Sequence, residues 1–164
     1  MSDKPKVEII QNTKSLAGKV RAIPGRSADD LLKGAGLRIE SLTADFTKYL
    51  REEIDRLAKA AIEAESDATK RADIVRTMNT IFNDLRGNGG TYGYPLVTEV
   101  GDSACKFIAD IAQWGTPQLA ILRAHTDAMR AIMAANITGD GGPIGRQLLA
   151  GLKAAVDKVK PSAP

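Results

Sequence analysis

The chain has 164 residues, a length typical of one domain with its own hydrophobic core. Its hydrophobic fraction of 43% and charged fraction of 26% are those of an ordinary soluble protein, and a formal charge of +3 is too small and dispersed to indicate nucleic-acid binding. No apolar run reaches the ~18 residues of a membrane-spanning helix, and the N-terminus lacks a signal-peptide pattern, so we expect no membrane association and a cytoplasmic location.

The chain begins with a segment that does not follow the pattern of a helix. Residues 1–26 combine mixed charges, two prolines and scattered apolar positions, which predicts an extended N-terminal arm. Ser27, followed by Asp29 and Asp30, then predicts the start of a helix, with the serine as cap and the acids in the first turn. Helical spacing of apolar residues continues to about residue 65, although Gly34 and Gly36 are expected to weaken or bend its first turns.

A second helix is expected from Asp67, and its apolar residues recur at spacings of one, three and four: Ile74, Val75, Met78, Ile81, Phe82 and Leu85. At ~100° per residue, the centre of this stripe points about 140° away from Asn83. Asn83 is therefore expected on the solvent side of the helix, with Asn79 one turn before it and Gly87 one turn after it.

The remaining predicted helices follow from start and stop signals. Pro95 suits the first position of a third helix, which is expected to end near Trp114. Thr116, as a capping hydroxyl before Pro117, predicts a fourth helix that continues to about Asn136.

The glycine-rich turn 139–142 precedes a fifth helix, which begins at Pro143 or Ile144 and is stopped by Pro161. We therefore predict an all-α fold over residues 27–160, a mostly antiparallel helical bundle with a four-helix core, and a frayed tail at 161–164.

The glycines after the second apolar stripe allow two interpretations. Each glycine inside a helix costs roughly 1 kcal/mol relative to alanine. Either the helix stops at Leu85 or Arg86 and residues 87–90 form its cap and a loop, or the helix runs on and the missing side chains let another backbone approach residue 83.

The segment NDLRGNGGTYGYP at residues 83–95 resembles the signature of the histidine-containing phosphotransfer (HPt) domains. Those domains carry a His, two residues, a Lys and a Gly, then small residues, an aromatic, a Gly, an aromatic and often a Pro. The resemblance implies a helical bundle of a bacterial phosphorelay that docks on a response-regulator receiver domain or a histidine kinase. It also implies that the second helix runs to about Tyr92.

The chain departs from this family at the position that carries the chemistry. Asn83 stands where the family has its phospho-accepting His, and Arg86 stands where the family commonly has Lys. The carboxamide nitrogen of Asn83 has its lone pair delocalised into the carbonyl, whereas an imidazole nitrogen is a usable nucleophile near neutral pH. We therefore expect no phosphotransfer activity, no cofactor and no metal, with Asn83 as a pseudo-acceptor.

The expected partner-binding face surrounds this position and consists of Arg76, Asn79, Arg86, Gly87 and Gly90. Asn and Arg side chains can hydrogen-bond a carboxylate, a phosphorylated aspartate or backbone groups of a partner. The chain is thus expected to modulate a phosphorelay by occupying a partner without carrying phosphate.

Two alternatives stay open. One is an active phosphotransfer protein, either with an altered residue at position 83 or with His125, the only histidine, as acceptor. His125 lies within an apolar stripe, however, which favours a packed and hydrogen-bonded core residue. The other alternative is a structural or self-associating helical bundle; the sequence does not determine the oligomeric state.

Cys105 is the only cysteine and lies on an apolar face, so we expect a buried thiol and no internal disulfide.

Overall fold

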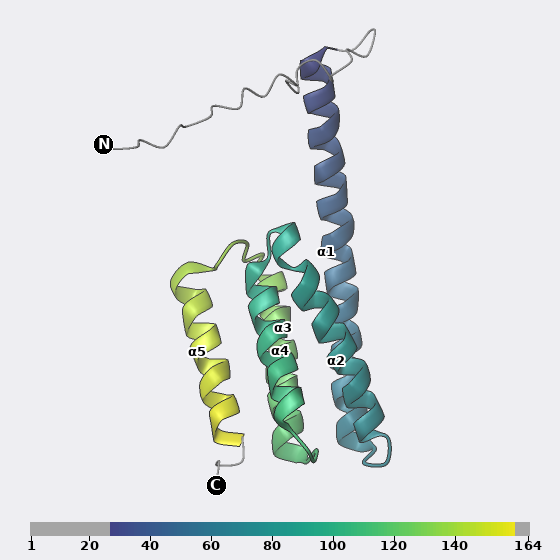
Figure 1. The fold of residues 1–164 in the computed structure, drawn as a ribbon, viewed down its shortest axis with the longest axis vertical. Coiled ribbons are helices and arrows are strands. Elements are labelled where there is room, and N and C mark those ends of the chain that lie inside the picture. Colours follow the sequence, from purple (N-terminus) through teal and green to yellow (C-terminus); the bar gives the residue numbers. More distant parts are fainter. Residues whose placement is uncertain (1–26, 160–164) are drawn as a thin grey trace, which may run out of the picture. The chain divides into compact units, whose positions relative to one another are not determined.

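The computed structural model describes residues 27–159, and within this range all regular elements are helices and no strand occurs, which confirms the predicted all-α class (Figure 1). The elements are α1 (Ala28–Ser66), α2 (Arg71–Asn88), the 3-10 helix η2 (Gly90–Tyr92), α3 (Pro95–Asp110), α4 (Thr116–Ala134) and α5 (Gly142–Val159). The predicted N-terminal arm at 1–26 and the predicted tail at 161–164 lie outside the described residues.

The packing divides the chain into two units whose boundary falls inside α1. The first unit ends at Glu40 and the second begins at Ser41. Within the second unit, one hydrophobic core draws fully buried side chains from successive helices, among them Leu50, Phe82, Phe107 and Leu122. Burial of such side chains is the main source of stability of a fold that has few long-range backbone hydrogen bonds.

The start of α1 is confirmed at the predicted residue. The Ser27 hydroxyl accepts the backbone N–H of Asp30 at 3.1 Å, and the Asp30 carboxylate accepts the backbone N–H of Ser27 at 3.2 Å. This reciprocal capping satisfies two donors that the first turn leaves without helical partners. The helix then continues through Gly34 and Gly36 without interruption.

Three predicted helix starts are wrong by one to four residues, and the fifth helix begins at Gly142 rather than at Pro143 or Ile144. The Asp67 carboxylate accepts the backbone N–H groups of Thr69 at 2.9 Å and Lys70 at 3.3 Å within a turn, and α2 begins only at Arg71. Similarly, Thr116 is already inside α4. The cap is Gly115, whose backbone N–H donates to the side chain of Gln118 at 3.1 Å.

Several predicted helix ends also differ. The third helix ends at Asp110 rather than near Trp114, and the fourth ends at Ala134 rather than about Asn136. The Trp114 side chain still packs, edge-on, against Phe107 with ring centroids 6.1 Å apart. The apolar pattern that suggested a longer third helix therefore reflects core packing of a loop residue.

Glycines let α2 and α3 approach each other closely. A Cβ atom on Gly101 would lie 2.9 Å from the Phe82 carbonyl oxygen, and one on Gly89 would lie 2.9 Å from the Thr98 hydroxyl. Distances this short are repulsive, so both positions exclude any side chain. The backbones of α2 and α3 are thus held at a fixed spacing beside residue 83.

Polar contacts join α1 and α4 within the second unit. Arg123 on α4 lies 3.6 Å from Glu65, and Arg130 lies 3.7 Å from Asp55, both on α1. None of the helices in residues 27–159 has the length and apolarity that crossing a bilayer requires.

Candidate functional site

Asn83 lies on the exposed face of α2, as the apolar stripe predicts. The side chains of Phe82 and Leu85 beside it are fully buried in the core, which fixes how the helix is turned about its axis. The Asn83 carboxamide makes no hydrogen bond to another residue of the range 27–159. Both its N–H donors and its carbonyl acceptor therefore face outward from a rigid helix.

Arg86 is drawn toward α3 rather than standing free beside Asn83. Its guanidinium lies 3.6 Å from the Asp102 carboxylate, which also binds the Lys106 ammonium at 2.6 Å. One carboxylate is thus shared by two cations. The three side chains are partly exposed, so the cluster is solvated and its excess positive charge borders the α3 side of residue 83.

The other residues of the predicted face are not all brought together. Asn79 is half-buried one turn before Asn83, and Arg76 is exposed two turns before it, where it forms an ion pair with Asp73 on its own helix. Gly90 lies beyond the end of α2, in η2, and its backbone N–H donates to the Thr98 hydroxyl at 2.9 Å. The compact part of the face is therefore Asn83, Arg86 and Gly87.

The second helix ends between its two predicted ends, after Arg86 but before Tyr92, so the end that the resemblance implies is wrong. Helix α2 continues through Gly87 to Asn88, past the alternative end at Leu85 or Arg86. The chain then tightens into η2, which ends at Tyr92 and is capped by Gly93 with a φ of 87°. This left-handed conformation suits glycine, which has no Cβ atom to clash.

Within residues 27–159, no neighbouring residue requires glycine at position 87. A Cβ atom at this position would meet nothing within 4 Å, whereas one at Gly89 would collide with Thr98. An alanine at 87 would favour the helix by up to about 1 kcal/mol. The site thus includes an open strip of backbone one turn from Asn83.

The α1 side of the site carries aromatic residues that the sequence analysis did not assign to it. The Tyr92 ring stacks on Phe46 with centroids 3.6 Å apart, and Phe46 also contacts Tyr49. Burial raises the pKa of Tyr49, and the nearby carboxylates of Glu53 and Asp84 raise it further. Asp84, the neighbour of Asn83, therefore faces the α1 side, while Arg86 faces α3.

No sequence signal could have assigned Tyr49 or Asp102 to this site. Both lie on helices other than α2, and only the packing of those helices brings them beside residues 84 and 86. A periodic pattern reports which face of one helix is buried, but it does not report which neighbour covers that face.

His125 is a packed core residue, as its apolar surroundings predict. Its side chain is fully buried, Nδ1 lies 2.8 Å from the Ile121 carbonyl oxygen, and Nε2 lies 2.9 Å from the Ser103 hydroxyl. A ring in this position has no path to a phosphorylated partner.

Cys105 on α3 is partly buried beside the hydrophobic core. Burial raises the pKa of its thiol above the ordinary value of 9.0, and the Arg86 guanidinium opposes this only in part. The thiolate, which is the reactive form, is therefore disfavoured at neutral pH.

The arrangement on α2 can donate and accept hydrogen bonds and can offer positive charge, but it contains no nucleophile poised beside a base.

Comparisons of the chain with protein-family profiles, with curated proteins and with solved structures give no match.

Proposed function

We propose that this chain is a degenerate relative of the HPt domains that docks on a response-regulator receiver domain or a histidine kinase and does not carry phosphate itself. The observation that supports it most is the exposed Asn83 on α2, with the open backbone of Gly87 one turn later. The carboxamide cannot accept a phosphoryl group, but its donors and acceptor can pair with groups at the rim of a partner's active site.

The fold part of this proposal is an antiparallel four-helix core made of the second unit's part of α1 together with α2, α3 and α4. The connections between these helices are short, which favours antiparallel neighbours. The ion pairs Arg123–Glu65 and Arg130–Asp55 join α4 back to α1, as closure of a four-helix core requires. In this proposal α5 adds Leu152 and Val156 to the hydrophobic core and is not part of the docking face.

Arg86 has a role that follows from its two contacts. In the free protein its guanidinium is partly neutralised by Asp102, which Lys106 also contacts. An acidic or phosphorylated partner would compete for this guanidinium, and Lys106 would remain to neutralise Asp102. The cluster thus offers one positive charge to a partner without leaving an unpaired carboxylate.

A phosphotransfer assay tests the chemical part of the proposal. The purified chain is incubated with radiolabelled, phosphorylated receiver domains from the same source, and we expect receiver binding without transfer of label. In Asn83→His, an imidazole nitrogen attacks the phosphorus and the bond to the aspartyl oxygen breaks, so the label should move to the chain. Asn88→His is the matched control, since residue 88 lies on the same helix about 140° around its axis from residue 83.

Stable label on the unmodified chain would contradict the proposal, and so would failure of every receiver and kinase to bind. The docking part is tested separately by Gly87→Leu, which should weaken binding at least tenfold by filling the open strip. Gly151→Leu is its control, because Gly151 on α5 is also exposed with nothing near its missing Cβ. Equal loss of binding in both variants would show that position 87 has no special part in docking.

A second candidate function, self-association, is favoured by exposed leucines in the first unit. Leu31, Leu32 and Leu37 on α1 are 41%, 70% and 68% exposed, although side chains of this kind are usually covered. A second copy of the same helix would cover them by packing leucine against leucine. Light scattering of the full chain should then give a dimer that Leu32→Lys converts to a monomer. A monomeric unmodified chain would exclude this candidate.

A further inference from the structure

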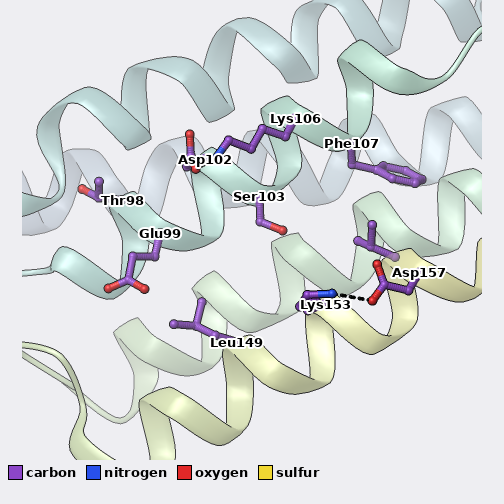
Figure 2. A pocket seen from close by; sticks show the side chains of 10 residues that line it. Thr98, Glu99, Asp102, Ser103, Lys106, Phe107, Leu149, Lys153 and Asp157 are labelled. Atoms are coloured by element: carbon purple, nitrogen blue, oxygen red, sulfur yellow. Dashed lines mark hydrogen bonds and ion pairs between the residues drawn. The ribbon is translucent and has the colours of Figure 1, made fainter. Parts of the chain in front are cut away.

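A groove between α3 and α5 has a volume of about 590 Å³, and its lining includes Asp102 and Lys106 of the Arg86 cluster (Figure 2). This size falls within the range of roughly 300–1,000 Å³ that is usual for small-molecule sites. Its apolar lining comes from both helices, with Phe107 on α3 and with Leu149 and Val156 on α5. The polar side chains of the lining determine which ligands the groove can bind.

The Ser103 hydroxyl in this groove has a fixed hydrogen-bonding role. The Ile121 carbonyl can only accept a hydrogen bond, so the Nδ1 atom of His125, 2.8 Å away, must carry the proton. In the neutral ring Nε2 is then an acceptor, and Ser103 donates its single hydroxyl hydrogen to it over 2.9 Å. Because that hydrogen is used, Ser103 presents only oxygen lone pairs to the groove.

The lysines that line the groove are already paired. Lys106 binds Asp102 at 2.6 Å, and Lys153 binds Asp157 at 2.6 Å, each within one helix. Glu99, in contrast, makes no ion pair with any residue of the range 27–159. It is therefore the one lining carboxylate whose charge is uncompensated within that range.

The three groups on α3 lie in one row. Glu99, Ser103 and Phe107 follow one another at intervals of four residues, which places them on the same face of the helix, with neighbouring Cβ atoms about 6 Å apart. Figure 2 shows Glu99 and Ser103 along α3, across the groove from Leu149 on α5. The row runs from a carboxylate, through a hydrogen-bond acceptor, to an apolar ring.

From this row we infer that the groove is a binding site for an amphiphilic organic cation, a primary ammonium with an apolar body. The ammonium group has three donors and no acceptor, so it can pair with the Glu99 carboxylate and the Ser103 oxygen together. Its apolar body lies along Phe107, Leu149 and Val156. A ligand with a carboxylate in place of the ammonium would be repelled by the Glu99 carboxylate. The Ser103 hydroxyl could not donate to it, because its hydrogen is donated to His125.

The test uses three probes with the same six-carbon body: hexylammonium, hexanol and hexanoate. Each is titrated into the isotopically labelled full chain, and the backbone amide shifts are followed by NMR. We expect hexylammonium to bind most tightly and hexanoate most weakly, with shifts concentrated in α3 and α5. Glu99→Gln should weaken hexylammonium binding about tenfold and leave hexanol binding unchanged.

Glu63→Gln is the matched control, because Glu63 is exposed on α1 and does not line the groove. Thermal melts of both variants show whether the fold is kept. Binding of hexanoate as tight as that of hexylammonium would overturn the inference. So would an equal effect of the two substitutions, amide shifts confined to other helices, or no binding of any probe.

Discussion

At the scale of single residues, the buried pair of His125 and Ser103 shows how a titratable group becomes part of a core. Both ring nitrogens have hydrogen-bond partners, and the ring is fully buried in its neutral form. Burial lowers the pKa of His125 below its ordinary value of 6.5, and the hydrogen bond to the Ile121 carbonyl opposes this only in part. The ring is thus part of the core, and we expect its titration to affect the stability of the fold.

The lowered pKa predicts a loss of stability in mild acid. Between the folded and unfolded pKa values, the unfolded chain binds more protons at residue 125 than the folded chain does. The free energy of unfolding should therefore fall as the pH drops below about 6.5, by at most ~1.4 kcal/mol per pH unit. Urea denaturation at several pH values between 7 and 5 measures this slope.

His125→Gln should be less stable at pH 7 but should lose this part of the pH dependence, since glutamine does not titrate. A variant with the same slope as the unmodified chain would show that other groups cause the acid sensitivity.

At the scale of elements, the contact between α2 and α3 depends on positions where no side chain fits. The Phe82 carbonyl oxygen and the backbone of Arg86 lie against Gly101, so this turn of α2 rests directly on α3. The same turn carries Asn83 on its outer side. The orientation of the candidate docking face is therefore set by the burial of Phe82 and Leu85 together with this close contact between α2 and α3.

Gly101→Ala tests this contact. The added Cβ atom would lie 2.9 Å from the Phe82 carbonyl oxygen, and we expect a loss of about 1–3 kcal/mol in the free energy of unfolding. The same substitution at Gly151, which has nothing within 4 Å, should stabilise the chain by up to about 1 kcal/mol. Chemical denaturation of the two variants compares them, and similar stabilities would mean that α2 and α3 separate easily.

At the scale of the whole second unit, one arginine joins the end of α1 and the start of α2 to the loop before α4, which is distant in sequence. Arg71, at the start of α2, donates from Nε to the Ala64 carbonyl on α1 and from Nη1 to the Trp114 carbonyl before α4, each at 3.0 Å. These carbonyls lie in or next to the turns that connect the helices. The arginine thus satisfies helix-end and loop acceptors that would otherwise depend on water.

Arg71→Ala is expected to destabilise the chain by about 1–3 kcal/mol, because two charge-assisted hydrogen bonds are lost and the acceptors are partly buried. Arg76→Ala is the control, since Arg76 is exposed and its guanidinium pairs with Asp73 of its own helix, and it should change stability by no more than about 0.5 kcal/mol. Calorimetric melts of both variants provide the comparison. An Arg71→Ala variant as stable as the unmodified chain would contradict the stabilising role of Arg71.

Local signals predicted some helix boundaries and missed others for a definite reason. Ser27 caps α1 as predicted, because its partner Asp30 is three residues away and the pattern is complete in the sequence. Thr116 was wrong as a cap because Gln118 can reach back to Gly115 and begin the helix one residue earlier. Two alternative capping residues stabilise a helix by amounts that differ by less than the free energy of packing that helix into the core. Tertiary packing therefore decides which residue caps the helix.

The sequence alone determined the helical class, the buried stripe of α2 and the exposure of Asn83, because each follows from the 3.6-residue period of a single helix. It also predicted the buried state of His125 from its apolar neighbours on α4. Only the tertiary structure decided that Asp102 holds Arg86, that Gly87 is open while Gly89 and Gly101 are not, and that Glu99 and Ser103 line a groove with α5. Each of these contacts joins two different helices, so it depends on which helix faces meet when the apolar stripes are buried. The periodic pattern within one helix does not determine which faces meet.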